Sequence, residues 1–209
     1  MTSIKLDALP LESTFNSLSS ISGSIPGTKM ATLLQTPTAT PSQPAQSIVF
    51  TSGSTIHISR PASAVFATIL NTKSYSAWNT SNPHVTFPTE SREQDSWTSG
   101  ASGTLEFHMG PSSTSTPQQV PVKVLSISED SAKDEYQLAW QGQMLPRWFG
   151  MAERVQSVRA VGAGECELVQ WESMSGWGIY VLNWVLGVRK QMDAVNLRYA
   201  EDLKRYLEK

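Results

Sequence analysis

The sequence has little cysteine and little charge for its length. Cys166 is the only cysteine among 209 residues, so no disulfide can form within the chain. A lone thiol is typical of a reducing compartment, and we expect a cytoplasmic protein in which Cys166 is a small buried strand residue. Charged residues make up 16% of the chain, with a formal net charge of −2 and no basic stripe. Because nucleic-acid binding needs clustered positive charge, we expect no nucleic-acid partner.

Long apolar runs are also missing. The most apolar run, residues 177–188, has about twelve residues, whereas a membrane-spanning helix needs about twenty. The first residues lack a basic segment followed by an apolar core, so no secretory signal is expected. We therefore expect a soluble protein without stable membrane insertion, present as a monomer or a weak homodimer.

The motifs of several enzyme classes are absent from the sequence. No cluster of His, Cys, Asp and Glu has the spacing of metal ligands, and no glycine-rich phosphate loop is present. There is no Gly-x-Ser-x-Gly turn, and the single cysteine has no matched histidine motif. We therefore expect no metal, no cofactor and no covalent nucleophile.

The first 46 residues differ in composition from the rest. They are dominated by Ser, Thr and Pro, as in the run Thr-Pro-Thr-Ala-Thr-Pro at residues 36–41. Such a segment buries too little apolar surface to offset its chain entropy. We expect a flexible extension over residues 1–46 and a folded domain over residues 47–209. In the alternative, an amphipathic piece docks on the domain through Leu6, Leu9, Leu11, Phe15, Leu18 and Ile21.

Hydrophobic periodicity predicts the elements of the domain. Alternating or apolar runs predict strands over residues 48–58, 85–87, 104–109, 120–128, 135–141, 151–161 and 165–175. Pro61 starts a helix after the first strand, and residues 73–78 predict a second short helix. About thirty residues without proline, from Gly178 to Lys209, predict one long helix with an apolar stripe.

This order of elements indicates the fold class. We predict an α+β helix-grip fold, in which a curved antiparallel sheet of about seven strands wraps a long C-terminal helix. Two short helices follow the first strand. One helix cannot cover such a sheet without leaving room between them, so we expect an internal ligand cavity.

Three segments carry a resemblance to a known superfamily. Residues 56–66 (IHISRPASAVF), followed by Tyr-Ser-Ala-Trp-Asn at residues 75–79, resemble the opening of the SRPBCC (START-like, birch-allergen-like) superfamily. Residues 138–142, the Glu-Arg-Val-Gln run at 153–156 and residues 170–176 are similar to its polyketide-cyclase/dehydrase and lipid-transport branch, particularly to fungal members. The resemblance covers roughly residues 47–209.

The resemblance implies the helix-grip fold and leaves the activity open. The superfamily includes lipid carriers, hormone receptors and natural-product enzymes, so its fold does not fix a function. Many members place a histidine soon after the glycine equivalent to Gly150. Here the next residues are Met-Ala-Glu-Arg, so we do not expect a mechanism that uses such a histidine.

Two glutamates and one histidine are the catalytic candidates. Glu153 and Glu172 lie on predicted neighbouring strands; if both faced the cavity, one could be protonated and the other ionised for acid–base catalysis. In the alternative, one of them pairs with Arg154 or Arg159 at the sheet surface. Glu172 has the better case, although both faces of its strand are apolar and its orientation stays open. His84 is placed at a strand entrance, near the expected cavity mouth.

Aromatic residues dominate the predicted ligand-binding set. Seven tryptophans are many for this length, and indole rings suit a flat or aromatic apolar ligand, although core packing accounts for any single one. Trp148 is the candidate gate residue. The predicted ligand-binding residues are Trp78, Asn79, Phe107, Trp140, Trp148, Gln170, Trp171, Tyr180 and Trp184.

Three functions are compatible with this sequence. The first is an apolar small-molecule-binding protein that acts as a polyketide cyclase/dehydratase-like enzyme of secondary metabolism, through positioning and acid–base residues. The second is a non-catalytic carrier of a lipid or another hydrophobic ligand. The third is a protein-interaction module, which an exposed apolar patch and a cavity filled by side chains would support.

Overall fold

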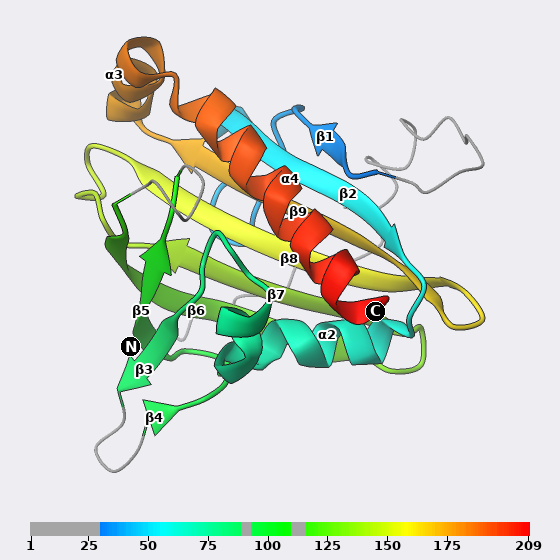
Figure 1. Cartoon of the computed structure of the whole chain (residues 1–209). Coiled ribbons are helices and arrows are strands. Elements are labelled where there is room, and N and C mark those ends of the chain that lie inside the picture. Colours follow the sequence, from blue (N-terminus) through cyan, green and yellow to red (C-terminus); the bar gives the residue numbers. More distant parts are fainter. Residues whose placement is uncertain (1–29, 89–92, 110–115) are drawn as a thin grey trace, which may run out of the picture.

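A curved antiparallel sheet wraps around the C-terminal helix (Figure 1). The computed structural model describes residues 30–88, 93–109 and 116–209. Within them the sheet has nine strands in the order β1-β2-β9-β8-β7-β6-β5-β3-β4. The strands are β1 (Thr32–Leu34), β2 (Ile48–Ile58), β3 (Val85–Pro88), β4 (Glu93–Gln94), β5 (Ser102–Phe107), β6 (Gln118–Asp130), β7 (Glu135–Gly142), β8 (Met151–Gly162) and β9 (Glu165–Ser175).

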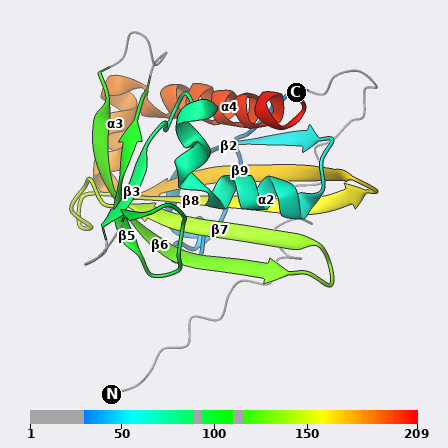
Figure 2. The same cartoon turned by 60° about the horizontal axis from the view of Figure 1, so that its bottom comes forward.

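The helices lie on the concave side of this sheet. They are α2 (Ala62–Leu70), α3 (Trp177–Leu186) and α4 (Val188–Leu207), with 3-10 turns at Ala45–Ser47 and Thr72–Ala77. Figure 2 shows α2 and α4 on the same side of the strands. Their apolar faces form one core with the sheet, in which Ile69, Leu138 and Leu203 are fully buried. The predicted helix-grip fold is confirmed; the short edge strands β1 and β4 were not predicted.

The C-terminal helix is not continuous, and the prediction of a single long helix is wrong. Gly187 separates α3 from α4 and adopts a left-handed conformation, with φ 61° and ψ 37°. A residue with a Cβ atom is strained in this conformation, whereas glycine is not. The break points α3 away from the axis of α4 (Figure 1). A run without proline therefore did not guarantee an uninterrupted helix.

Residues 34–43 cover the opposite, convex face of the sheet. Leu34 packs with Val155, Val169 and Trp171 in a second apolar cluster, and the Trp171 indole Nε1 donates to the carbonyl oxygen of Ala39 at 3.2 Å. β1 also pairs with β2 at the sheet edge. Residues 30–46 of the predicted extension thus contact the domain. Residues 1–29, including the amphipathic piece from Leu6 to Ile21, lie outside the described residues.

Candidate functional site

A cavity of about 300 Å³ lies between the concave face of the sheet and the two C-terminal helices. β5–β9 supply its walls, and α3 and the first turns of α4 close it from the other side. Most of its surface is apolar. Typical lining residues are Leu105, Phe107, Trp140, Met174, Ile179 and Met192. Met144 and Leu186, both more than half exposed, also line it and mark its mouth.

One charged pair interrupts this apolar wall. The strand register places Trp140, Arg154 and Glu172 directly opposite one another across β7, β8 and β9. Arg154 donates to Glu172 Oε2 through Nη2 at 2.7 Å and through Nε at 3.1 Å. The guanidinium also lies over the Trp140 ring, 5.3 Å from its centroid, which adds a cation–π contact. The three side chains therefore fix one another on the cavity wall.

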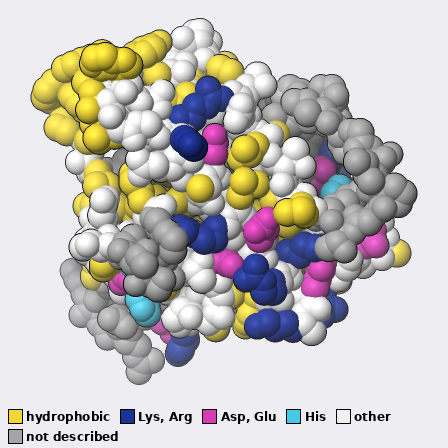
Figure 3. All heavy atoms as spheres, turned by 45° about the horizontal axis from the view of Figure 1, so that its top comes forward, with side chains coloured by type: hydrophobic (Ala, Val, Ile, Leu, Met, Phe, Trp, Pro, Cys, Tyr) yellow, Lys and Arg dark blue, Asp and Glu magenta, His cyan; other side chains and the backbone are white. Residues whose placement is uncertain are grey.

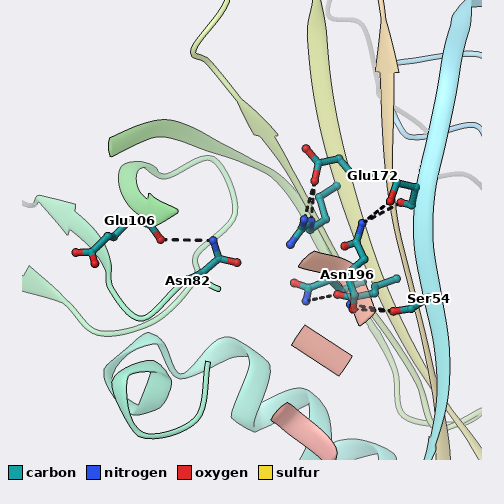
Figure 4. A network of polar contacts seen from close by, with 9 residues as sticks. Ser54, Asn82, Glu106, Glu172 and Asn196 are labelled. Atoms are coloured by element: carbon teal, nitrogen blue, oxygen red, sulfur yellow. Dashed lines mark hydrogen bonds and ion pairs between the residues drawn. The ribbon is translucent and has the colours of Figure 1, made fainter. Parts of the chain in front are cut away.

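The pair keeps hydrogen-bonding capacity toward the cavity. Both Arg154 bonds end on the same carboxylate oxygen, and among the described residues neither Arg154 Nη1 nor Glu172 Oε1 has a hydrogen-bond partner. Asn82 and Gln118 are the other polar residues of the lining. Figure 4 shows Glu172 on the sheet and Asn82 across from it, held to the Glu106 carbonyl oxygen at 3.4 Å. A ligand oxygen could thus be bound at the sheet side of the cavity.

Glu153 lies on the other face of the sheet, away from the cavity. In the register of β8 and β9 it is opposite Ser173, whereas Arg154 is opposite Glu172. Ser42 donates to the Glu153 carboxylate through its backbone N–H, at 3.2 Å, and through its hydroxyl. Burial raises the pKa of Glu153, and the hydrogen bonds from Ser42 lower it in part. The structure therefore does not bring the two predicted catalytic glutamates into one site.

The third catalytic candidate, His84, is also outside the cavity. It lies beside Thr72, Ser76 and Asp95 in a separate polar cleft on the surface. Trp78 and Asn79, which were predicted to bind the ligand, instead make contacts that stabilise the fold. Trp78 is packed edge-on against Tyr199, with ring centroids 5.2 Å apart, and the Asn79 side-chain oxygen accepts from the backbone N–H of Asn82 at 2.8 Å.

Gln170 and Trp171 have structural partners as well. Gln170 shares the concave face with Glu172, but its amide donates to the carbonyl oxygen of Asn196 on α4 at 2.8 Å and to Ser54 at 3.1 Å. Asn196 in turn donates to the Ser52 hydroxyl at 3.0 Å. This network, part of which Figure 4 shows, joins α4 to β2 and β9. Trp171 lies on the convex face, under residues 34–43.

The remaining predicted aromatic residues lie on the surface. Tyr180 and Trp184, on α3, are 65% and 86% exposed, and Trp148, in the loop between β7 and β8, is 70% exposed. Of the predicted site residues, Phe107, Trp140 and Glu172 line the cavity. Arg154 lines the cavity as well, although the sequence predicts it only as a possible partner of a glutamate at the sheet surface. The alternative that pairs Arg154 with a glutamate was the available signal, because an arginine paired with Glu172 lies on the same face of the sheet as Glu172.

Two further observations concern metals and membranes. In the three described ranges no group of three or more His, Cys, Asp or Glu residues is placed to hold a metal ion. No helix in the described part of the chain combines the length and apolar character needed to cross a membrane.

Comparison with solved structures supports the fold. A hypothetical protein of Helicobacter pylori matches with a TM-score of 0.57 and 12% identity, over 73% of this chain and 84% of that one. A human lipid transfer and protein localization domain matches with a TM-score of 0.52 and 10% identity, over 90% of this chain and 92% of that one. A START superfamily protein of Mycobacterium smegmatis matches with a TM-score of 0.52 and 15% identity, over 74% of this chain and 94% of that one. At such low identities the likeness concerns the fold alone.

Comparison of sequences identifies a relative. No family model matches the chain. The oxopyrrolidines biosynthesis cluster protein O of Penicillium oxalicum is 30% identical over 172 residues, which cover 71% of this chain and 83% of that protein. This relationship shows that the chain belongs to one family with the Penicillium protein, and the solved structures show that it has the helix-grip fold of START-like proteins.

Proposed function

We propose that this protein binds an apolar small molecule bearing one carbonyl or carboxylate group. The apolar part of the ligand occupies the cavity, and its oxygen contacts Arg154. The observation that carries the proposal is the buried Arg154–Glu172 pair within a mostly apolar wall. The cavity volume of about 300 Å³ lies at the lower end of the range of about 300–1,000 Å³ typical of ligand sites. A compact metabolite fits that volume.

Arg154 is well suited to select such a ligand. Its side chain is 2% exposed, so a hydrogen bond from Nη1 to a ligand oxygen would form away from water, where charge-assisted bonds are strong. Glu172 and Trp140 already hold the guanidinium in place, which lowers the entropic cost of binding. A purely aliphatic ligand could not accept a hydrogen bond from Arg154 Nη1 and would bind more weakly.

The relative suggests where such a ligand originates. The Penicillium protein is named for a cluster that makes oxopyrrolidines. We propose that the ligand here is an intermediate or product of a fungal biosynthetic pathway. An oxo group on an otherwise apolar metabolite matches the acceptor that Arg154 requires.

Proton transfer is a second candidate function, favoured because Glu172 and Arg154 line the same cavity and, among the described residues, Glu172 Oε1 and Arg154 Nη1 have no hydrogen-bond partner. If Arg154 binds a ligand carbonyl oxygen, Glu172 can remove a proton from the adjacent carbon, and Arg154 stabilises the resulting enolate. If the ligand carries a double bond one carbon further along, return of the proton to the far end of that double bond would complete an isomerisation. If it carries a second carbonyl group, attack of the enolate carbon on that carbonyl carbon would form a ring, and the proton would go to the second carbonyl oxygen. Deuterium incorporation beside the carbonyl of 2-decanone in D₂O, lost in Glu172→Gln, would support this function; equal incorporation in both proteins would contradict it.

Native mass spectrometry tests the binding proposal. We expect the purified full-length protein to retain or take up decanoic acid, a probe with one carboxylate on an apolar chain. Ala152→Phe places a ring in the cavity and should abolish the complex. Val161→Phe, at an exposed position of the β8–β9 hairpin, is the matched control and should bind as the native chain does. Failure of the native protein to bind, or equal binding by all three, would refute the proposal.

A further inference from the structure

The end of the molecule formed by α3 exposes an unusually large apolar surface. We call it the α3 patch: its residues are Met144, Trp148, Trp177, Tyr180, Val181, Trp184, Val185 and Leu186. Within the patch, exposure ranges from 46% for Val181 to 86% for Trp184. Apart from Met30 and Val161, every strongly exposed large apolar side chain of the described residues belongs to it. Figure 3 shows these side chains gathered at one corner of the molecule, where α3 lies.

The patch is held in place by close packing beneath it. The Gly178 N–H donates to the Phe149 carbonyl oxygen at 2.9 Å, and a Cβ atom on Gly178 would be only 2.4 Å from the Phe149 ring. The Trp177 ring packs edge-on against Phe149, with centroids 5.0 Å apart. Ile179, on the inner side of α3, is 2% exposed. The apolar side chains of the patch therefore lie on a well-packed helix and not on a frayed end of the fold.

The charged residues in the two chain segments that form the patch are all basic. Residues 176–192 contain no aspartate or glutamate, and neither do residues 142–152. The charged residues within these two segments are Arg147, Arg189 and Lys190. Arg147 and Lys190 are exposed. In Figure 3 basic side chains, with an acidic side chain beside them, lie next to the apolar corner.

We propose that the α3 patch docks this protein on the surface of an anionic lipid bilayer. Trp and Tyr side chains favour the interface between lipid headgroups and hydrocarbon, while Val and Leu bury among the acyl chains. α3 has ten residues, about half of what a membrane-spanning helix needs, so it lies in the interface and does not cross it. The basic border supplies attraction to anionic headgroups, which a partner of neutral or positive charge would not use.

The patch and the ligand cavity meet at one place. Met144 and Leu186 belong to the patch and also line the cavity, and Leu182 of α3 lines it as well. Docking through α3 would therefore put the mouth of the cavity against the bilayer. An apolar ligand could then pass between membrane and cavity without crossing water. Bilayer docking itself does not depend on the proposed function, because the tryptophans of the patch, Trp148, Trp177 and Trp184, are not part of the cavity lining.

Vesicle co-sedimentation of the full-length protein tests this inference. We expect binding to phosphatidylcholine vesicles that contain phosphatidylserine and weaker binding to phosphatidylcholine alone. Trp184→Ser removes the most exposed indole and should weaken binding by about tenfold or more. Lys190→Gln should weaken it by about fivefold, and only on the anionic vesicles. Val161→Ser, at an exposed apolar position outside the patch, should leave binding unchanged.

Two results would overturn the inference. One is a protein that stays in the supernatant with both kinds of vesicle. The other is a homodimer in sedimentation velocity that dissociates in Trp184→Ser while vesicle binding is absent, which would assign the patch to a second copy of the chain. Because decanoic acid binding is measured without vesicles, failure of docking and failure of the proposed function are separate outcomes.

Discussion

Arg154 and Glu172 face each other directly across β8 and β9, with Nη2 2.7 Å from Oε2, in the wall of an apolar cavity. Both side chains are nearly buried, with 2% and 9% of their surface exposed. Removing two charges from water costs several kcal/mol, roughly offset at best by their attraction. Folding alone does not require such a pair, and this is the reason for assigning it to the ligand.

Separating the pair should destabilise the protein more than replacing it. Arg154→Met leaves the Glu172 carboxylate buried without its partner, and we expect a loss of about 3–5 kcal/mol in the free energy of unfolding. The double variant Arg154→Met, Glu172→Met should lie near the native value or above it, since an apolar pair of similar size needs no desolvation. Urea unfolding measures both. A single variant as stable as the double one would show that the two side chains do not interact.

The fold was predictable, whereas the face of each strand was not. Apolar alternation located the long strands, because it reflects packing that one sheet imposes on all of them. Along β9, however, both faces are apolar: Leu168 and Met174 face α4, while Val169 and Trp171 face residues 34–43. A segment rich in Ser, Thr and Pro gave no sign that it would cover the second face. The orientation of Glu172 relative to Glu153 therefore could not be read from periodicity.

The exposed position of α3 could not be predicted from the sequence, for a different reason. Its tryptophans and tyrosine resemble core or cavity residues, and only the left-handed turn at Gly187 directs them outward. A single glycine in a helical pattern is compatible with a continuous helix, so the pattern alone did not reveal the break. The predicted ligand-binding roles of Tyr180 and Trp184 followed from that assumption.

Gly187→Ala tests the break directly. An added Cβ atom would meet nothing within 4 Å, so the cost is conformational only. At a φ of 61° we expect a loss of about 1–2 kcal/mol in stability, measured as a lower thermal midpoint. Gly142→Ala is the control, because its nearest neighbour would be 3.7 Å away and its φ is outside the left-handed region. Unchanged stability of Gly187→Ala would mean that α3 and α4 can join into one helix.

Glu153 should make stability depend on pH. Burial raises the pKa of this carboxyl in the folded protein, so the folded protein retains a proton that the unfolded chain has already released. Stability then falls as the pH rises from the ordinary glutamate pKa through the higher folded-state pKa. The glutamine side chain of the Glu153→Gln variant cannot ionise, so the variant should not show this decrease in stability.

Urea midpoints between about pH 4 and pH 8 provide the measurement for Glu153. The difference in stability between Glu153→Gln and the native chain should shift in favour of the variant as the pH rises. Glu165→Gln, at an exposed strand end, serves as the matched control. Parallel profiles for the native chain and Glu153→Gln would contradict the expected titration.

Cys166 should be inert in the folded protein. The thiol is fully buried, and burial raises its pKa to about 12, so almost none of it is the reactive thiolate near neutral pH. We expect no reaction with Ellman's reagent under native conditions and full reaction in urea. Rapid labelling of the native protein would show that this end of β9 opens readily.

Methionine methyl NMR tests the central claim most directly, because the chain places methionines both in and outside the cavity. Met109, Met144, Met174 and Met192 line it, whereas Met30 and Met151 do not. On titration with decanoic acid, we expect the methyl signals of the first group to shift, with those of Met174 and Met192 strongest, and those of Met30 and Met151 to stay in place. Shifts confined to the signal of Met144, which also belongs to the exposed patch, or no shifts at all, would contradict a ligand bound between the sheet and the C-terminal helices.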